Sequence, residues 1–105
     1  MIEDVVEWLV REVSDLLDVS SVGLYEFIWL LRSRQPGMTD DERRVIADLA
    51  LRQLFSSEPV RLILLTWPNH DPEGEVGLEA VRASDWNDPP EGGPYMAVKR
   101  VPSSS

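Results

Sequence analysis

The chain has 105 residues, of which 43% are hydrophobic and 28% charged, and its formal net charge is −9. This length predicts a single domain with a real hydrophobic core, and the absence of cysteine excludes disulfides and thiolate chemistry, as is typical of a cytoplasmic protein. No apolar run approaches the ~20 residues of a membrane-spanning helix, and the acidic start MIEDVVEWLV is unlike a secretory signal.

Residues 2–18 are predicted to form an amphipathic helix. Apolar positions spaced three and four apart form one stripe, made of Ile2, Val5, Val6, Leu9, Val13, Leu16 and Leu17. The remaining surface of this helix is acidic, and the first 31 residues contain seven acids against one arginine, a net charge of −6. Such a region repels a phosphate backbone and attracts a basic protein partner.

Two further helices are predicted around the turn Pro36–Gly37. The second begins near Val22, with Ser20 or Ser21 as its cap, and is apolar nearly all round, so that Trp29 is expected in the core. The third runs from about residue 40 to 55, behind a capping box of Thr39 and Glu42. Its inward positions are predicted to be Val45, Ile46, Leu49, Ala50, Leu54 and Phe55, with Arg43, Arg44, Asp48 and Arg52 left for solvent or a partner.

Two strands are predicted after the helices, at about 60–67 and 95–101, and they are expected to pair. Between them, PNHDPEGE (68–75) indicates an acidic loop, residues 77–86 a short helix or an irregular strand, and DPPEGGP a second loop. The predicted fold class is α+β, with three N-terminal helices followed by a small antiparallel sheet, winged-helix-like. The alternative is a plain three-helix bundle with a small sheet packed against it. Residues 1–101 form the single domain and 102–105 a disordered tail.

One core is expected to join the helices and strands. It is predicted to contain Leu9, Val13, Leu24, Phe27, Ile28, Leu31, Ile46, Leu49, Leu54, Leu62 and Leu64.

No residue set in the sequence predicts catalysis, a metal or a cofactor. There is no cysteine, and the one histidine, His70, has no helical partner four residues away. Its acidic neighbours Asp71, Glu73 and Glu75 are ligand types for a divalent cation, but a solvated acidic loop is the simpler interpretation.

A nucleic-acid interface is the first candidate site, because helix-turn-helix proteins read DNA with the start of the second motif helix. Here that start is Asp40, Asp41 and Glu42, which offers no donors to phosphate. The counter-evidence is a strip of arginines, with Arg43, Arg44 and Arg52 as the candidate DNA contacts and Arg32 and Arg34 beside them.

A protein interface is the second candidate site. Aromatic residues at the ends of elements and in loops are enriched at interfaces, although for each one alone the simpler interpretation is that it caps the edge of a small core. The predicted partner-binding residues combine two tryptophans with loop acids: Trp67, Asp71, Glu73, Glu75 and Trp86.

The segments VGLYEFIWLLR, TDDERRVIADLALRQLF and VRLILLTWP together resemble small winged-helix-like proteins of high-GC actinobacteria, over roughly residues 20–90. The resemblance implies a fold and no activity. In size and acidity the chain is also similar to immunity proteins and antitoxins, which block basic toxins.

These observations favour a non-enzymatic protein-binding module. More specifically, they suggest an immunity protein or an antitoxin-like inhibitor of a basic partner. Homodimer formation is left open. The alternative is a winged helix-turn-helix transcriptional regulator that contacts DNA through the arginines of the third helix.

Overall fold

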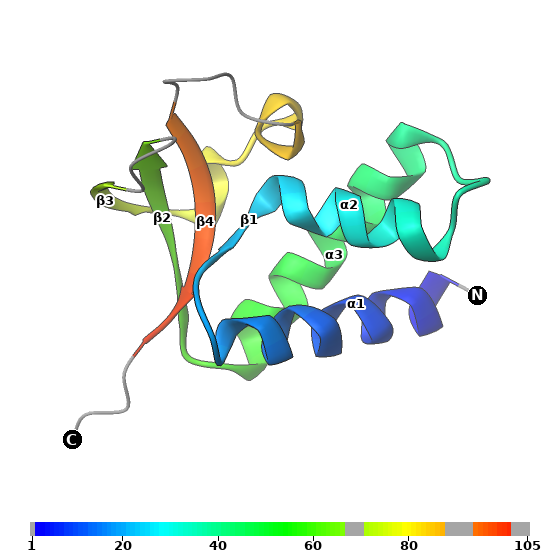
Figure 1. The fold of residues 1–105 in the computed structure, drawn as a ribbon, viewed down its shortest axis with the longest axis horizontal. Coiled ribbons are helices and arrows are strands. Elements are labelled where there is room, and N and C mark those ends of the chain that lie inside the picture. Colours follow the sequence, from blue (N-terminus) through cyan, green and yellow to red (C-terminus); the bar gives the residue numbers. More distant parts are fainter. Residues whose placement is uncertain (1, 67–70, 88–93, 102–105) are drawn as a thin grey trace.

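The computed structural model describes residues 2–66, 71–87 and 94–101. The described residues form three helices and one antiparallel sheet, with three of its four strands after the helices, which confirms the α+β class (Figure 1). The helices are α1 (Ile2–Leu17), α2 (Leu24–Arg34) and α3 (Asp40–Ser57), and the strands are β1 (Val22–Gly23), β2 (Val60–Thr66), β3 (Asp71–Val76) and β4 (Pro94–Arg100). Two 3₁₀ turns, Leu78–Ala80 and Ala83–Trp86, lie between β3 and β4.

The sheet has the strand order β1-β4-β2-β3. β2 and β4 pair in antiparallel register from Val60 opposite Arg100 to Thr66 opposite Pro94, so the predicted pairing of these strands is confirmed. β1 was not predicted, because its two residues are too few to show an alternating pattern. It lies between α1 and α2 and pairs with β4, which completes a winged-helix-like order in which β3 and the 3₁₀ turns enlarge the wing. We call residues 71–87 the wing segment.

The predicted acidic loop 68–75 is wrong at its C-terminal end, where Asp71–Val76 forms the edge strand β3. Leu64 faces Gly74 and Leu65 faces Pro72, so the register shifts between them and Glu73 is the extra residue of a bulge. Proline is tolerated at edges and bulges because no ladder hydrogen bond is lost there. Gly74 has a φ of 138°, which favours glycine. Residues 68–70 and the predicted tail 102–105 lie outside the described residues.

The N-terminal caps of α2 and α3 differ in how well they were predicted. α2 starts two residues later than expected, and in place of a serine cap the Glu26 carboxylate accepts a hydrogen bond from the Gly23 N–H at 2.7 Å. The capping box of α3 is confirmed, because Thr39 Oγ1 accepts from the Glu42 N–H at 3.2 Å and Glu42 Oε1 accepts from the Thr39 N–H at 2.9 Å. The backbone hydrogen bond from Thr39, followed by its hydroxyl, lowers the pKa of Glu42.

The core lies between the three helices and the inner face of the sheet. Nine of the predicted core residues are buried: Leu9, Val13, Leu24, Phe27, Ile28, Leu31, Ile46, Leu54 and Leu62. Leu64 is half-buried against them, whereas Leu49 is 43% exposed and was wrongly placed. The prediction for Trp29 was also wrong, because its side chain lies at the surface against Tyr25, with the ring centroids 4.9 Å apart.

The orientation of α3 about its own axis explains the error at Leu49. α3 turns Ala47, Ala50 and Leu51 into the core beside Ile46 and Leu54, and the two small alanines let neighbouring helices approach closely. Val45 and Leu49 are consequently directed outward. No helix among the described residues is long and apolar enough to cross a membrane.

Truncating a fully buried core residue should destabilise the fold far more than truncating an exposed one. Leu31 is 0% exposed and Leu16 is 40% exposed. We expect Leu31→Ala to lower the free energy of unfolding by about 2–5 kcal/mol, and Leu16→Ala to change it by about 1 kcal/mol or less. Chemical denaturation measures both, and a Leu31→Ala midpoint equal to that of the wild type would refute the core assignment.

The Glu42 carboxylate should contribute stability that depends on pH. Because its folded-state pKa lies below the ordinary glutamate value of 4.5, the contribution is present above that value and is lost as the pH falls through the folded pKa. Wild type and Glu42→Gln should therefore differ most near neutral pH and converge in acid. Denaturation midpoints across this pH range measure the difference, and a constant gap would contradict the expectation.

Candidate protein-interaction surface

Arg43 holds the turn between α2 and α3. Its guanidinium donates from Nη1 to Asp40 Oδ1 at 2.9 Å, and from Nη2 to the carbonyl oxygens of Gln35 at 3.2 Å and Pro36 at 3.1 Å. The side chain is only 9% exposed, so its predicted position facing solvent or DNA is wrong. The physical reason is local: the turn carbonyls need donors, and an arginine in the first turn of α3 can fold back to supply them.

The other arginines of the predicted DNA strip already have partners within the chain. Arg44 pairs with Asp41, and Arg52 Nε pairs with Asp48 Oδ2 at 2.9 Å, each about one turn away along α3. Beside the turn, Arg32 Nη2 lies 3.6 Å from Asp40 Oδ1, and the Arg34 guanidinium lies 4.8 Å from the Trp8 ring centroid. A DNA phosphate would therefore have to compete for Arg32, Arg44 and Arg52 with carboxylates of the same chain that already lie next to them.

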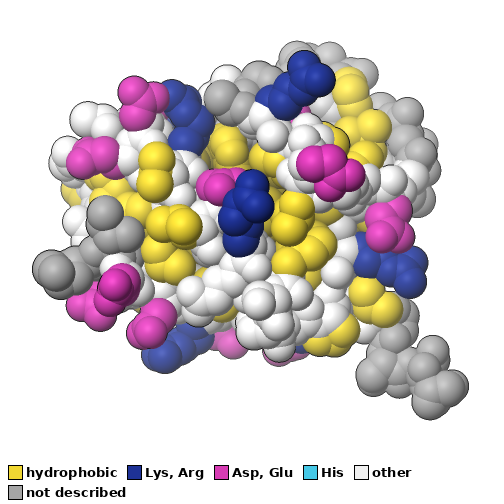
Figure 2. Space-filling model, turned by 180° about the vertical axis from the view of Figure 1, so that it is seen from behind, with side chains coloured by type: hydrophobic (Ala, Val, Ile, Leu, Met, Phe, Trp, Pro, Cys, Tyr) yellow, Lys and Arg dark blue, Asp and Glu magenta, His cyan; other side chains and the backbone are white. Residues whose placement is uncertain are grey.

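Val45 and Leu49 form an exposed apolar ridge on the outward side of α3. Val45 is 56% exposed and Leu49 43% exposed, one turn apart between the two ion pairs. Figure 2 views the molecule from the side on which α3 lies and shows hydrophobic side chains interrupted by acidic and basic ones. We call this surface the α3 face, and it consists of Asp41, Arg44, Val45, Asp48, Leu49 and Arg52.

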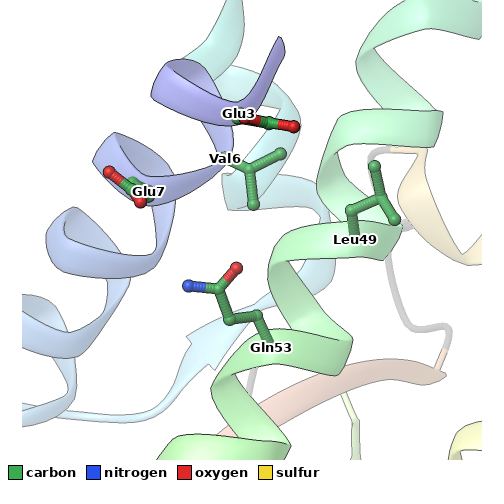
Figure 3. Close-up of a pocket in the computed structure, with 5 residues that line it drawn as sticks. All are labelled: Glu3, Val6, Glu7, Leu49 and Gln53. Atoms are coloured by element: carbon green, nitrogen blue, oxygen red, sulfur yellow. The ribbon is translucent and has the colours of Figure 1, made fainter.

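A groove lies on each side of the apolar ridge. The α1–α3 groove, about 300 Å³ in volume, is lined by Glu3, Val6, Glu7, Leu49 and Gln53 (Figure 3). The α3–wing groove, about 510 Å³, is lined by Asp41, Arg44, Val45, Asp48, Leu49, Val81, Arg82 and Trp86. Leu49 lines both grooves, so it lies on the ridge between them.

The predicted partner-binding acids are positions of the edge strand β3. Trp67 lies outside the described residues, and for Asp71 and Glu73 the structure describes the backbone in β3 alone. The side chain of Glu75 is 60% exposed and its Oε1 lies 3.7 Å from Arg61 Nη1. These positions are on the edge strand of the sheet, whereas the two grooves lie along α3.

Trp86 is a core residue. It is 4% exposed, and its ring centroid lies 5.7 Å from that of Phe27 on α2. The structure thus supports the second interpretation of this tryptophan, that it closes the edge of a small core. Only its margin reaches the α3–wing groove, so it cannot serve as an exposed anchor without leaving the core.

The acidic residues of the described part of the chain do not gather into a metal centre. Within residues 2–66, 71–87 and 94–101, no group of three or more His, Cys, Asp or Glu side chains is placed to hold a metal ion. His70, the histidine considered with the loop acids, lies outside these ranges.

The structural role of Arg43 predicts different costs for neighbouring arginines. Arg43→Ala removes a charged donor group from the turn carbonyls of Gln35 and Pro36 and should lower the free energy of unfolding by about 1.5–3 kcal/mol. Arg52→Ala removes an exposed pair between residues four apart and should cost about 0.5 kcal/mol or less. Thermal or chemical unfolding compares the two, and equal small effects would show that the turn does not need Arg43.

No protein-family model, curated protein or solved structure matches this chain. The binding role of the α3 face therefore has to be inferred from its own residues. They form an apolar ridge with a groove on either side, and the arginines of this face are paired with aspartates of the same helix.

Proposed function

We propose that this protein is a non-enzymatic protein-binding module of the cytoplasm that contacts its partner through the α3 face. The observation that carries the proposal is the exposure of Val45 and Leu49 on the outward side of α3, the helix that would be the recognition helix of a helix-turn-helix protein. Burying exposed aliphatic side chains against a partner stabilises the complex, because it removes apolar surface from water. These side chains have no hydrogen-bond donor for a phosphate oxygen.

The partner is proposed to be basic. The chain carries a formal charge of −9, and α1, which borders the α3 face, contributes many of its acids. A negative field of this kind speeds encounter with a positively charged protein and selects against acidic ones. An immunity protein or antitoxin-like inhibitor of a basic toxin is the specific form of this proposal, since such an inhibitor needs both fast encounter and an apolar contact.

DNA binding is the second candidate, and the winged-helix-like order of elements is the observation in its favour. The side chains argue against it. α3 begins with Asp40, Asp41 and Glu42, Arg43 is used by the turn, and Arg44 and Arg52 are paired with carboxylates. The fold is compatible with a DNA-binding protein, but the side chains on its surface favour a protein partner.

The proposal predicts that apolar truncation on the α3 face releases the partner. The tagged protein would be used to capture partners from a lysate of its source organism, alongside the double variants Val45→Ala/Leu49→Ala and Leu16→Ala/Val19→Ala. The second pair also removes exposed apolar side chains, but from α1 and the residues after it. We expect the α3 variant to weaken capture of a stoichiometric protein by about tenfold or more, and the control to retain it.

Two results would contradict the proposal. Equal capture by both double variants would place the interface elsewhere on the molecule. Retention of duplex DNA in a gel shift at about 50 mM salt, lost steeply as salt is added, would favour the regulator, particularly if Arg44→Ala or Arg52→Ala abolished it.

A further inference from the structure

The α1–α3 groove combines an apolar floor with an acidic rim. Val6, which is 6% exposed, and Leu49 form the apolar part, and Gln53 on α3 adds an amide. Figure 3 shows Val6 projecting from α1 toward α3, the Gln53 amide pointing toward α1, and Glu3 extending from α1 toward α3, with Leu49 lying over α3. Glu7 lies one helical turn after Glu3. The lining includes two carboxylates and no cation.

Neither rim carboxylate is neutralised by the fold. Within the described residues, Glu3 and Glu7 form no ion pair, unlike Asp41 and Asp48 on the neighbouring α3 face. A second hollow lies beside the groove along α1, with Glu7 and Gln53 lining both; its other residues are Val10, Arg11, Ser14, Asp15 and Glu58, so it contains one cation and three carboxylates in all.

We propose that this groove binds a basic amphipathic helix of the protein partner. A lysine or arginine of that helix lays its alkyl stem over Val6 and Leu49 and places its cation at Glu3 and Glu7. Long basic side chains have this dual character, an apolar stem and a charged head. Basic residues at successive turns of one helix would follow the groove between α1 and α3 in the manner of helix-in-groove recognition.

The charge of the groove decides against a second copy of this chain as the occupant. A homodimer through this surface would bring the acidic α1 of one copy toward that of the other, and like charges at an interface are unfavourable. The inference rests on the proposed function, because it specifies which segment of the partner the protein-binding surface receives.

The test uses a display library of helical peptides whose charged and apolar positions are randomised without bias. Enriched peptides are then titrated by fluorescence anisotropy against wild type, Glu3→Gln/Glu7→Gln and the control Asp4→Asn/Glu12→Gln. Both double variants remove two negative charges from α1, but Asp4 and Glu12 do not line the groove. We expect enriched peptides to be basic and amphipathic, with binding weakened about fivefold by the groove variant and less than about twofold by the control.

Several results would overturn the inference: no enrichment, enrichment of peptides without basic residues, or equal affinities for the two double variants. Circular dichroism and thermal unfolding of each variant show whether it is folded before its affinity is compared. Failure of the inference is distinguishable from failure of the proposed function. If capture of the partner requires Val45 and Leu49 but not Glu3 and Glu7, the α3 face remains the interface, and the α1–α3 groove does not bind a basic helix of the partner.

Discussion

The buried guanidinium of Arg43 determines how the helical layer is assembled. A cation withdrawn from water needs acceptors for its donors. Nη1 and Nη2 find them in the Asp40 carboxylate and the carbonyls of Gln35 and Pro36, whereas the buried Nε has no partner among the described residues. Because these groups belong to the end of α2, the turn and the start of α3, one side chain connects all three. This connection holds the start of α3 against the end of α2.

A second polar cluster connects the sheet to the helices. Arg100 on β4 donates to Glu58 Oε1 at 2.7 Å and to the Ser14 carbonyl at 2.9 Å, and its Nη2 lies 3.3 Å from Asp18 Oδ1. The end of the last strand is thereby joined to α1 and to the residue that ends α3. With the turn held by Arg43 and the sheet held by Arg100, α3 has one face fixed in the core and the opposite face open.

Much of the fold could be predicted because its signals are local. The capping box of Thr39 and Glu42 marks the start of α3, and the apolar spacing of residues 2–17 marks α1. The apolar run from Val60 marks β2. β1 could not be predicted, because two residues show no period, and β3 was obscured because Pro72 and Gly74 are turn formers that an edge bulge also accepts.

The candidate site was harder to predict than the fold, because α3 is apolar over much of its circumference. Val45 and Leu49 form one possible stripe, and Ile46, Ala47 and Ala50 another, so spacing alone does not decide which is buried. The packing against α1 and α2 decides it. For Trp86 the error is the opposite one, because a residue predicted at the surface is buried. It lies outside any periodic segment, so the sequence gives no sign that it packs against Phe27.

The proposed contact of the outward side of α3 with a protein partner can be tested by amide chemical-shift mapping of the ¹⁵N-labelled protein, titrated with the captured partner and separately with duplex DNA. We expect the partner to perturb amides of α3 around Val45 and Leu49 and of the first turns of α1, and DNA to perturb none of them. Perturbation of α3 by DNA, or partner-induced shifts confined to β3, would contradict it.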